Sequence, residues 1–326
     1  MPGPPPAVAA TRVAVRRALA GLPPGSLVLV ACSGGADSLA LAAAAAVEVA
    51  RLGSRAGAVV VDHRLQAGSA DVAERAAATC RGLGLSPVHV VPVDVPAAGP
   101  GPEARARVAR YAALEAVADR EHAAYLLLGH TRDDQAEQVL LGLARGSGAR
   151  SLSGMPRARG RVLRPLLELG REVTREACSA LGLEPWEDPH NRDTAYRRVR
   201  ARRLVGDLEE QLGPGVAAGL ARSADLLRDD ADLLEELAGS ARERLGDAPW
   251  PVTDLLALPR SLRGRVLRAL LTGAGAPPGS TFAAHVAAVE ALLTDWHGQG
   301  PVDLPGGVRV TRRDGRLLVD PGRPVE

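Results

Sequence analysis

The feature that most constrains the fold is an apolar strand that runs directly into a glycine turn and then into a helix. Residues 27–31 read LVLVA, a continuous apolar run typical of a strand buried on both faces of a parallel sheet. A helix is expected from about residue 37 to 52. Backbone N–H groups at such a turn and helix N-terminus bind anions. We therefore predict a phosphate-binding loop formed by Ser33, Gly34, Gly35, Ala36, Asp37 and Ser38.

The first two hundred residues alternate between strand and helix signals. Further strands are predicted at 58–61, 87–93 and 125–128, and further helices at 71–83 and 103–121. Strands joined by helical crossovers form a parallel sheet with helices on both faces. Ligands bind such sheets beyond the carboxyl ends of the strands. Ser33, Asp62 and His130 each follow a strand. We therefore expect them to lie close together at the edge of the sheet where the strands end.

The sequence predicts three parts. The fold class is α/β, with a parallel-sheet, Rossmann-like nucleotide-binding domain over residues 1–205. Leucines at helical spacing among acidic residues predict a helical linker at 206–247. A proline-rich break then begins a small α+β domain at 248–326, which ends in short β segments. Residues 145–164 carry few helix signals, and the proline-rich N-terminal tail is expected to be disordered.

Composition narrows the chemistry. The 326 residues contain no lysine, so the glycine turn cannot use a P-loop lysine. Cys32, Cys80 and Cys178 are far apart in sequence and form neither a disulfide framework nor a zinc or iron–sulfur pattern, which fits a reducing cytoplasm. The N-terminus lacks a signal-peptide pattern, and the apolar run 39–50 is too short to cross a bilayer. We expect a soluble cytoplasmic protein with no membrane partner.

The glycine turn suits a pyrophosphate group. Its two glycines allow the backbone to approach phosphate oxygens closely, and Asp37 is placed to hold a Mg²⁺ ion that bridges the phosphates. A plain structural turn after a strand is the alternative interpretation. The complete six-residue string after the apolar strand favours the phosphate site.

A second chemical signal follows the strand at 125–128. Gly129 and His130 lie at the entrance of a predicted helix, and Asp133, Asp134 and Glu137 lie in its first turns. Asp134 and Glu137 share a helical face. Carboxylates in this position suit Mg²⁺ binding or proton transfer from an attacking amine. The alternative is an acidic first turn that only caps the helix and complements its dipole.

Together the two signals resemble the PP-loop ATPases, and among them the tRNA(Ile)-lysidine synthetases. The resemblance rests on S-G-G-x-D-S and G-H-x-x-D-D-Q-A-E, and it spans about residues 26–318. Further matching segments are VDHRL (61–65), ARVARY (106–111), RGSG (145–148) with LSGM (152–155), RPLL (164–167), WEDPHN (186–191) and VDLPGGVRVTRRDG (302–315).

The resemblance implies ligation of free L-lysine to the wobble cytidine of an isoleucine tRNA with a CAU anticodon. ATP would adenylate the C2 oxygen of the base, and the lysine ε-amine would then displace AMP. The residues implied to contact ATP are Ser33, Gly34, Gly35, Ala36, Asp37, Ser38, Asp62, His63, Arg107, Arg110 and Gly129, with Mg²⁺ held by Asp37 and Asp134. Arg107 and Arg110 have an alternative role as ion-pair partners of Glu103 and Glu115.

The implied reaction needs a neutral amine, although free lysine is mostly protonated near neutral pH. A carboxylate beside the amine must therefore bind the ammonium group and accept its proton. We assign catalytic roles to Asp37, His130, Asp133 and Asp134. Asp133 or Asp134 is the expected base, with His130 as the second candidate.

RNA recognition is expected to depend on arginines, which bind phosphate through paired donors and stack on bases. The candidates are Arg145, Arg197, Arg198, Arg200, Arg202 and Arg203, with Arg192 nearby. A solvated arginine-rich helix face is the alternative. The sequence also departs from the family pattern here, because Val199 stands where that pattern has asparagine and Val205-Gly206 replaces Leu-Pro.

The residues disfavour three other classes. A tRNA thiolase would need a cysteine pair or an iron–sulfur cluster, and an amidotransferase-linked synthetase would need a glutaminase cysteine. A non-catalytic RNA-binding protein with a decayed nucleotide fold conflicts with the intact motifs, and the low aromatic content, 2%, disfavours base stacking as a main binding mode. The oligomeric state stays open, with a homodimer as one option.

Overall fold

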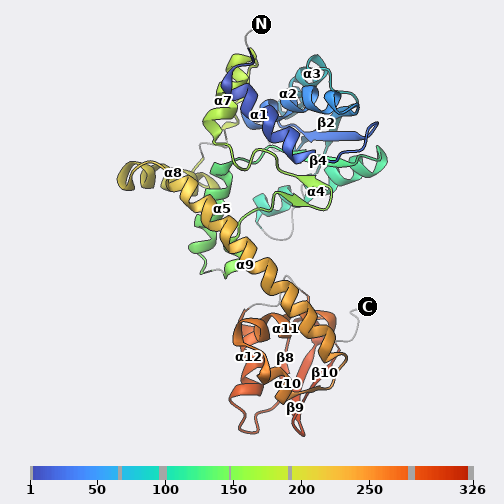
Figure 1. Cartoon of the computed structure of the whole chain (residues 1–326), viewed down its shortest axis with the longest axis vertical. Helices are drawn as coiled ribbons and strands as arrows, with labels where there is room; N and C mark the ends of the chain where they lie inside the picture. The colour runs from blue at the N-terminus through green and yellow to red at the C-terminus, as the bar shows by residue number, and fades with distance from the viewer. Residues whose placement is uncertain are drawn as a thin grey trace. The chain divides into compact units, whose positions relative to one another are not determined.

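The computed structural model describes residues 3–64, 68–94, 101–146, 148–189, 193–277 and 283–321. The chain forms two compact units, Met1–Leu227 and Arg228–Glu326 (Figure 1). The predicted boundary at residue 205 lies within helix α8 (Arg197–Leu212), and the one at residue 247 follows helix α9 (Val216–Leu245). The three-part functional division stays a prediction.

The first unit is built on a six-stranded sheet with the strand order β3-β2-β1-β4-β6-β5. All neighbouring strands are parallel except β5, which runs antiparallel to β6. The strands are β1 (Leu27–Ala31), β2 (Arg55–Asp62), β3 (Val88–Pro92), β4 (Tyr125–Leu128), β5 (Ala158–Arg159) and β6 (Val162–Leu163). The parallel α/β class is confirmed, and β6 is a strand that the sequence did not predict.

Helices cover both faces of this sheet, as the continuous apolar strand requires. Val28 and Val30 of β1 pack into the core that contains α2 (Ala36–Arg51) and α3 (Ser69–Gly82). The alternate residues Leu27 and Leu29 pack with the opposite core, under α4 (Pro102–Arg120). The remaining helices of this unit are α5 (Arg132–Leu143), α6 (Ala149–Leu152) and α7 (Arg171–Ala180), besides α1 and α8.

The N-terminal segment is helical, which shows that the prediction of a disordered tail was wrong. Helix α1 (Pro6–Ala18) begins at a proline, a residue that suits the first helical position. It packs against α2 and α7. The Nε atoms of Arg12 and Arg16 each lie 2.8 Å from the carboxylate of Glu48 on α2, which is 1% exposed. These long-range contacts stabilise a segment whose composition alone indicated disorder.

The second unit has the α+β composition that the sequence predicted. A four-stranded antiparallel sheet with the order β7-β10-β9-β8 packs with helices around Leu255, Leu267, Leu292 and Val310. Its elements are β7 (Trp250–Pro251), α10 (Val252–Ala257), α11 (Arg260–Gly273), α12 (Ala283–Thr294), β8 (Val302–Asp303), β9 (Arg309–Arg313) and β10 (Arg316–Asp320). Among the described residues of the whole chain, no helix has the length and apolar character needed to cross a membrane.

Candidate active site

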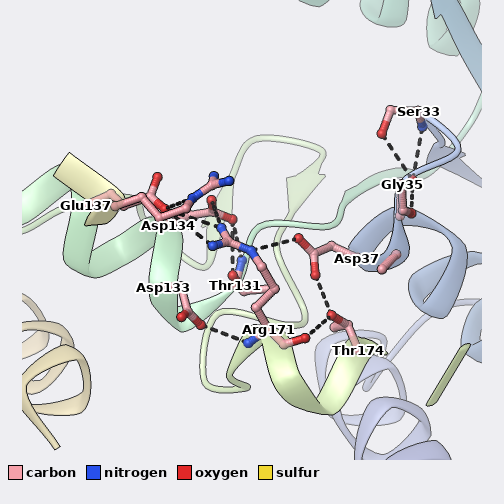
Figure 2. Close-up of polar contacts among 12 residues, drawn as sticks. Ser33, Gly35, Asp37, Thr131, Asp133, Asp134, Glu137, Arg171 and Thr174 are labelled. Carbon is pink, nitrogen blue, oxygen red and sulfur yellow. Dashed lines mark hydrogen bonds and ion pairs between the residues drawn. The ribbon is translucent and has the colours of Figure 1, made fainter. Parts of the chain in front are cut away.

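The glycine turn connects β1 to α2, and the Trp186 N–H donates to the Gly34 carbonyl at 2.9 Å. Gly34 adopts φ +81°, a left-handed conformation, and a Cβ atom added there would lie 3.2 Å from the Cβ of Ala76. Ser38 braces the turn from inside, because its Oγ accepts from the Ser33 N–H at 3.1 Å and donates to the Gly35 carbonyl at 2.9 Å (Figure 2). Ser38 therefore shapes the loop, and Ser33 and Gly35 lie at its mouth.

The second motif lies beside the first because β4 pairs with β1. Leu128 is the register partner of Ala31, so the loops that follow these strands leave the sheet next to each other. A Cβ atom on Gly129 would lie 3.0 Å from the carbonyl oxygen of Asp37. Glycine at this position therefore allows the His130 loop to contact the first turn of α2.

A cluster of carboxylates surrounds one guanidinium group, that of Arg171 at the start of α7 (Figure 2). Its Nε lies 3.5 Å from Asp37 Oδ2, and its Nη2 lies 2.9 Å from Asp134 Oδ1 and 3.4 Å from Glu137 Oε1. The backbone N–H of Arg171 donates to Asp133 Oδ2 at 2.8 Å. Asp37 also accepts a short hydrogen bond from Thr174. Carboxylates from two separate motifs thus meet at one cation.

These carboxylates differ in acidity. Burial raises the pKa of Asp37 against the opposing effects of Thr174 and Arg171, and burial likewise raises the pKa of Glu137. Burial would also raise the pKa of Asp134, but the charge of Arg171 and further donors outweigh it, so its pKa is lowered. Asp134 is the better anion, and Glu137 is the better proton acceptor.

Asp134 also caps its own helix, as the alternative interpretation proposed. Its Oδ2 accepts from the Thr131 backbone N–H at 2.8 Å, and Thr131 is the N-cap residue of α5. Oδ1 meanwhile faces Arg171. The capping interaction thus orients a carboxylate that also belongs to the cluster, so the two interpretations are compatible.

A small pocket opens beside this cluster, with a volume of about 150 Å³. Its lining residues are Asp133, Glu137, Arg202, Val205, Gly206, Glu209 and Ala217. Arg202 Nε lies 2.7 Å from Glu137 Oε1. The other oxygen, Glu137 Oε2, is buried and finds no hydrogen-bond donor among the described residues. The pocket therefore combines acidic groups, one guanidinium and a short apolar wall.

On the other side of His130, arginines gather around Tyr111. The guanidinium carbons of Arg107 and Arg110 lie 5.1 Å and 5.7 Å from the centre of its ring. Nη2 of Arg164 donates to the tyrosine hydroxyl at 3.4 Å. Glu115, an alternative partner for the first two arginines, pairs instead with Arg161. The side chain of Glu103, the other alternative partner, lies outside the described residues. A concentration of positive charge of this kind suits a polyanion.

His63 and His130 are neutral at physiological pH, because the pKa of each is lowered. Burial lowers the pKa of His130 to about 3, with further lowering by Arg164, Arg110 and Arg198. Burial and Arg110 also lower the pKa of His63. The Nδ1 atoms of both are buried and accept no hydrogen bond from the part of the chain described. Asp62 is buried and accepts from the Arg64 N–H at 3.0 Å, so it holds the turn after β2.

The arginines predicted to bind RNA do not act as one group. Arg197, Arg200 and Arg203 are exposed on α8, and Arg145 is exposed after α5. Arg202 points inward to Glu137, and the charge of Arg198 acts on His130 and Asp134. Arg192 lies outside the described residues. Val199 and Val205 are buried on the inner side of α8, which explains apolar residues at these positions.

Sequence reasoning assigned no role to Arg171 or Thr174. It named Arg164 only within a matching segment, and it named Glu137 as a carboxylate for Mg²⁺ or proton transfer without assigning it to the site. One signal for Arg171 was available. An arginine at the first position of a helix is opposed by the helix dipole, so it must be compensated by nearby acids. The sequence contains no signal for which acids those are, because Arg171 is 34 residues from Glu137 in the chain.

The site fits ATP and Mg²⁺ on its own geometry. The glycine turn at a helix N-terminus and the arginines around Tyr111 are groups that bind phosphate. Oxygens of Asp37 and Asp134 already converge on one cation. Within the described ranges no group of three or more His, Cys, Asp or Glu side chains could hold a metal ion. Mg²⁺ commonly takes only one or two carboxylates and completes its shell with phosphate oxygens and water.

A parallel sheet with this glycine loop after its first strand defines the class of PP-loop nucleotide-binding proteins. The family model described as PP-loop domain matches residues 11–209, and the one described as TilS substrate binding domain matches residues 251–318. A solved U34-tRNA thiolase from Methanococcus maripaludis, which holds a 4Fe-4S cluster, shares the fold. Its TM-score is 0.57 at 20% identity, over 68% of this chain and 80% of the thiolase.

Curated relatives narrow the class to one family. The chain is 56% identical to the tRNA(Ile)-lysidine synthase of Thermobifida fusca over 98% of this chain and 99% of that protein. The corresponding enzymes of Salinispora tropica and Streptomyces coelicolor are 55% and 51% identical, each over 98% of this chain and at least 98% of theirs. The chain belongs to the tRNA(Ile)-lysidine synthase family, as its motifs predicted, and family membership implies use of ATP and a tRNA substrate.

Proposed function

We propose that this protein joins the ε-amine of free L-lysine to C2 of the wobble cytidine in an isoleucine tRNA with a CAU anticodon. The C2 oxygen attacks the α-phosphorus of ATP, so an O–P bond forms and pyrophosphate leaves. The ε-amine then attacks C2, a C–N bond forms and AMP departs with the oxygen. The meeting of the glycine loop with a carboxylate-lined pocket carries this proposal, because it puts a place for pyrophosphate beside a place for an amine.

The glycine loop and the arginines at Tyr111 would receive the triphosphate. Ser33, Gly34 and Gly35 would offer backbone N–H groups at the start of α2, and Arg107 and Arg110 would offer charge. Asp37 and Asp134 would hold Mg²⁺, which when bound neutralises phosphate charge. His130 and His63 would meet the nucleotide as neutral groups, since burial lowers the pKa of each.

The pocket of about 150 Å³ suits lysine in particular. Val205 and Ala217 offer apolar surface to the four-carbon stem, and Arg202 offers a partner to the α-carboxylate. The buried Oε2 of Glu137 offers an unused acceptor for the ammonium group. Its carboxyl has a pKa raised by burial, so it also accepts a proton more readily than Asp134. Glu137 is therefore our preferred base, with Asp133 on the same pocket wall.

We assign one role to each of the three predicted parts of the chain. Residues 1–205 would carry catalysis, 206–247 would link the domains and 248–326 would bind tRNA. The exposed arginines Arg145, Arg197, Arg200 and Arg203 remain candidates for phosphate contacts. A tRNA substrate and free lysine imply a cytoplasmic location. A homodimer remains one option for the assembly.

Incorporation of labelled lysine into acid-precipitable RNA tests the proposal. Purified protein, Mg-ATP and the isoleucine tRNA transcript should yield labelled RNA, whereas the CAU methionine tRNA should not. Asp37→Ala should abolish both labelling and pyrophosphate release. Glu137→Gln should lose at least tenfold in labelling while tRNA-dependent pyrophosphate release persists, because only the amine step needs that carboxylate. Wild-type protein that releases pyrophosphate yet never labels the isoleucine transcript would rule out lysine as the substrate.

A further inference from the structure

One exposed aromatic residue stands out in the second unit. Among the tryptophan and tyrosine side chains that the structure describes, only Trp296 is exposed, at 39%. It lies in the connection between α12 and β8 and is followed in sequence by the exposed His297. In a chain with only 2% aromatic residues, an exposed indole is a suitable contact for a partner, because its ring is apolar and its N–H is polar.

The loop that carries Trp296 is held independently of the indole. Gln299 Nε2 donates to the carbonyl of Asp295 at 2.9 Å, and its Oε1 accepts from the His297 N–H at 2.8 Å. The Asp295 N–H donates to the Ala291 carbonyl at 2.9 Å, which extends α12 into the loop. Because backbone and amide contacts fix this loop, the exposed indole is presented by a rigid support.

One face of the indole is backed by a cation. The guanidinium carbon of Arg312, on β9, lies 5.2 Å from the centre of the Trp296 ring. The same guanidinium is fixed by Nη1, which donates to the carbonyls of Leu292 at 2.9 Å and Leu293 at 3.3 Å. Arg312 thus covers one side of the ring and closes the end of α12. The indole thus keeps 39% of its surface exposed while a fixed positive charge contacts its ring.

The charge of the surrounding segment indicates the kind of partner. Residues 251–318 contain eight arginines and five acidic residues, and Arg313 and Arg316 are exposed on the β9–β10 hairpin. A pocket of about 300 Å³ in this unit is lined by Arg260 and Arg263, and by Glu290, which pairs with Arg263 at 2.9 Å. An aromatic ring backed by a guanidinium, in a segment rich in arginine, suits a nucleic acid, because a base stacks on the ring and arginines bind phosphates.

We propose that Trp296, backed by Arg312, is a stacking platform for an unpaired base of the RNA substrate. The base must be unpaired, because a base within a duplex cannot expose a face to a side chain. The second unit would therefore hold a loop or a single-stranded end of tRNA and would not bind only the backbone of a stem. This inference rests on the proposed function for the identity of the RNA, and it assigns a residue and a contact type that the family match does not.

Tryptophan fluorescence and tRNA affinity test the platform. The isoleucine tRNA transcript should quench wild-type fluorescence, and Trp296→Phe should remove most of that quenching. Trp296→Ala should weaken tRNA binding by about fivefold or more, since stacking on one base is worth about 1 kcal/mol or more. Trp296→Phe keeps a ring and should retain most of the affinity. Leu256→Ala, at a position 41% exposed in the same unit, is the matched control and should bind normally.

A blunt RNA duplex of similar length separates stacking from charge. Wild type and Trp296→Ala should bind the duplex equally, because it offers no unpaired base. In the labelling reaction, Trp296→Ala should raise the KM for tRNA and leave the KM for ATP unchanged. Equal tRNA affinity in wild type and Trp296→Ala, or an equal loss on duplex and tRNA, would overturn the platform. Failure of wild type to label RNA while it still shows Trp296-dependent binding would instead overturn the proposed reaction alone.

Discussion

Replacement of Arg171 by methionine tests whether this guanidinium holds the carboxylate cluster together. The side chain is 14% exposed, and its nitrogens lie 2.9 Å from Asp134 and 3.4 Å from Glu137. Methionine keeps much of the apolar stem and removes only the charge and its donors. Asp37, Asp134 and Glu137 would then face one another, with Arg202 as the nearest remaining cation, at Glu137. Loss of one partner from a buried ion pair costs about 3 to 5 kcal/mol.

The loss of folding stability in the Arg171→Met variant should grow as pH rises. Without Arg171, mutual repulsion and burial would raise the pKa values of the three carboxyl groups above those of the unfolded chain, about 4. Groups with raised pKa values stabilise the fold below the unfolded pKa, and that stability is lost as pH rises through the folded pKa. The variant should therefore approach wild type near pH 4 and show the full deficit at pH 8.

Thermal melting at these two pH values measures the effect. At pH 8 without Mg²⁺, the variant should melt roughly 10 °C below wild type, since each kcal/mol shifts the Tm of a unit of this size by about 2 to 4 °C. Millimolar Mg²⁺ should recover part of the loss by occupying the unpaired carboxylates. Arg175→Met, at an exposed position of the same helix, should melt with wild type. A deficit of equal size at both pH values would show that Arg171 acts through packing, and no deficit would refute the reasoning.

Two further predictions concern α1 and the glycine turn. Glu48→Gln should cost about 3 kcal/mol at pH 7 in urea melts, because the buried carboxylate faces Arg12 and Arg16. Hydrogen bonding by Arg16 lowers the pKa of Glu48 despite burial, so the deficit should shrink as pH falls below about 4, whereas Glu74→Gln in the exposed pair with Arg81 should change little. Gly34→Ala should raise the KM for ATP about tenfold, since a left-handed alanine costs about 1 to 2 kcal/mol and the turn must distort. Gly53→Ala, also at positive φ but outside the loop, should lower the Tm and leave that KM unchanged.

Local sequence signals predicted much of the first unit. Strands β1 and β4 have the predicted bounds, and the helices between the strands differ from prediction by one or two residues. Strongly apolar runs, glycine turns and helix periodicity are properties of neighbouring residues, so they can be read from a short window. Strand β6 and helix α1 were missed because they lack such local signals. Strand β6 has only two residues, and α1 depends on a distant carboxylate.

The sequence by itself determined the glycine turn, the carboxylate-bearing helix and the family, because each depends on residues close together in the chain. Only the tertiary structure decided how these parts combine. It brought Arg171 between Asp37 and Glu137, turned Arg202 from the expected RNA surface to the pocket, and placed Arg312 beneath Trp296. These contacts join residues 16 to 134 positions apart. The sequence around a side chain does not indicate which distant charge or ring it will contact, so these contacts could not be predicted from the sequence.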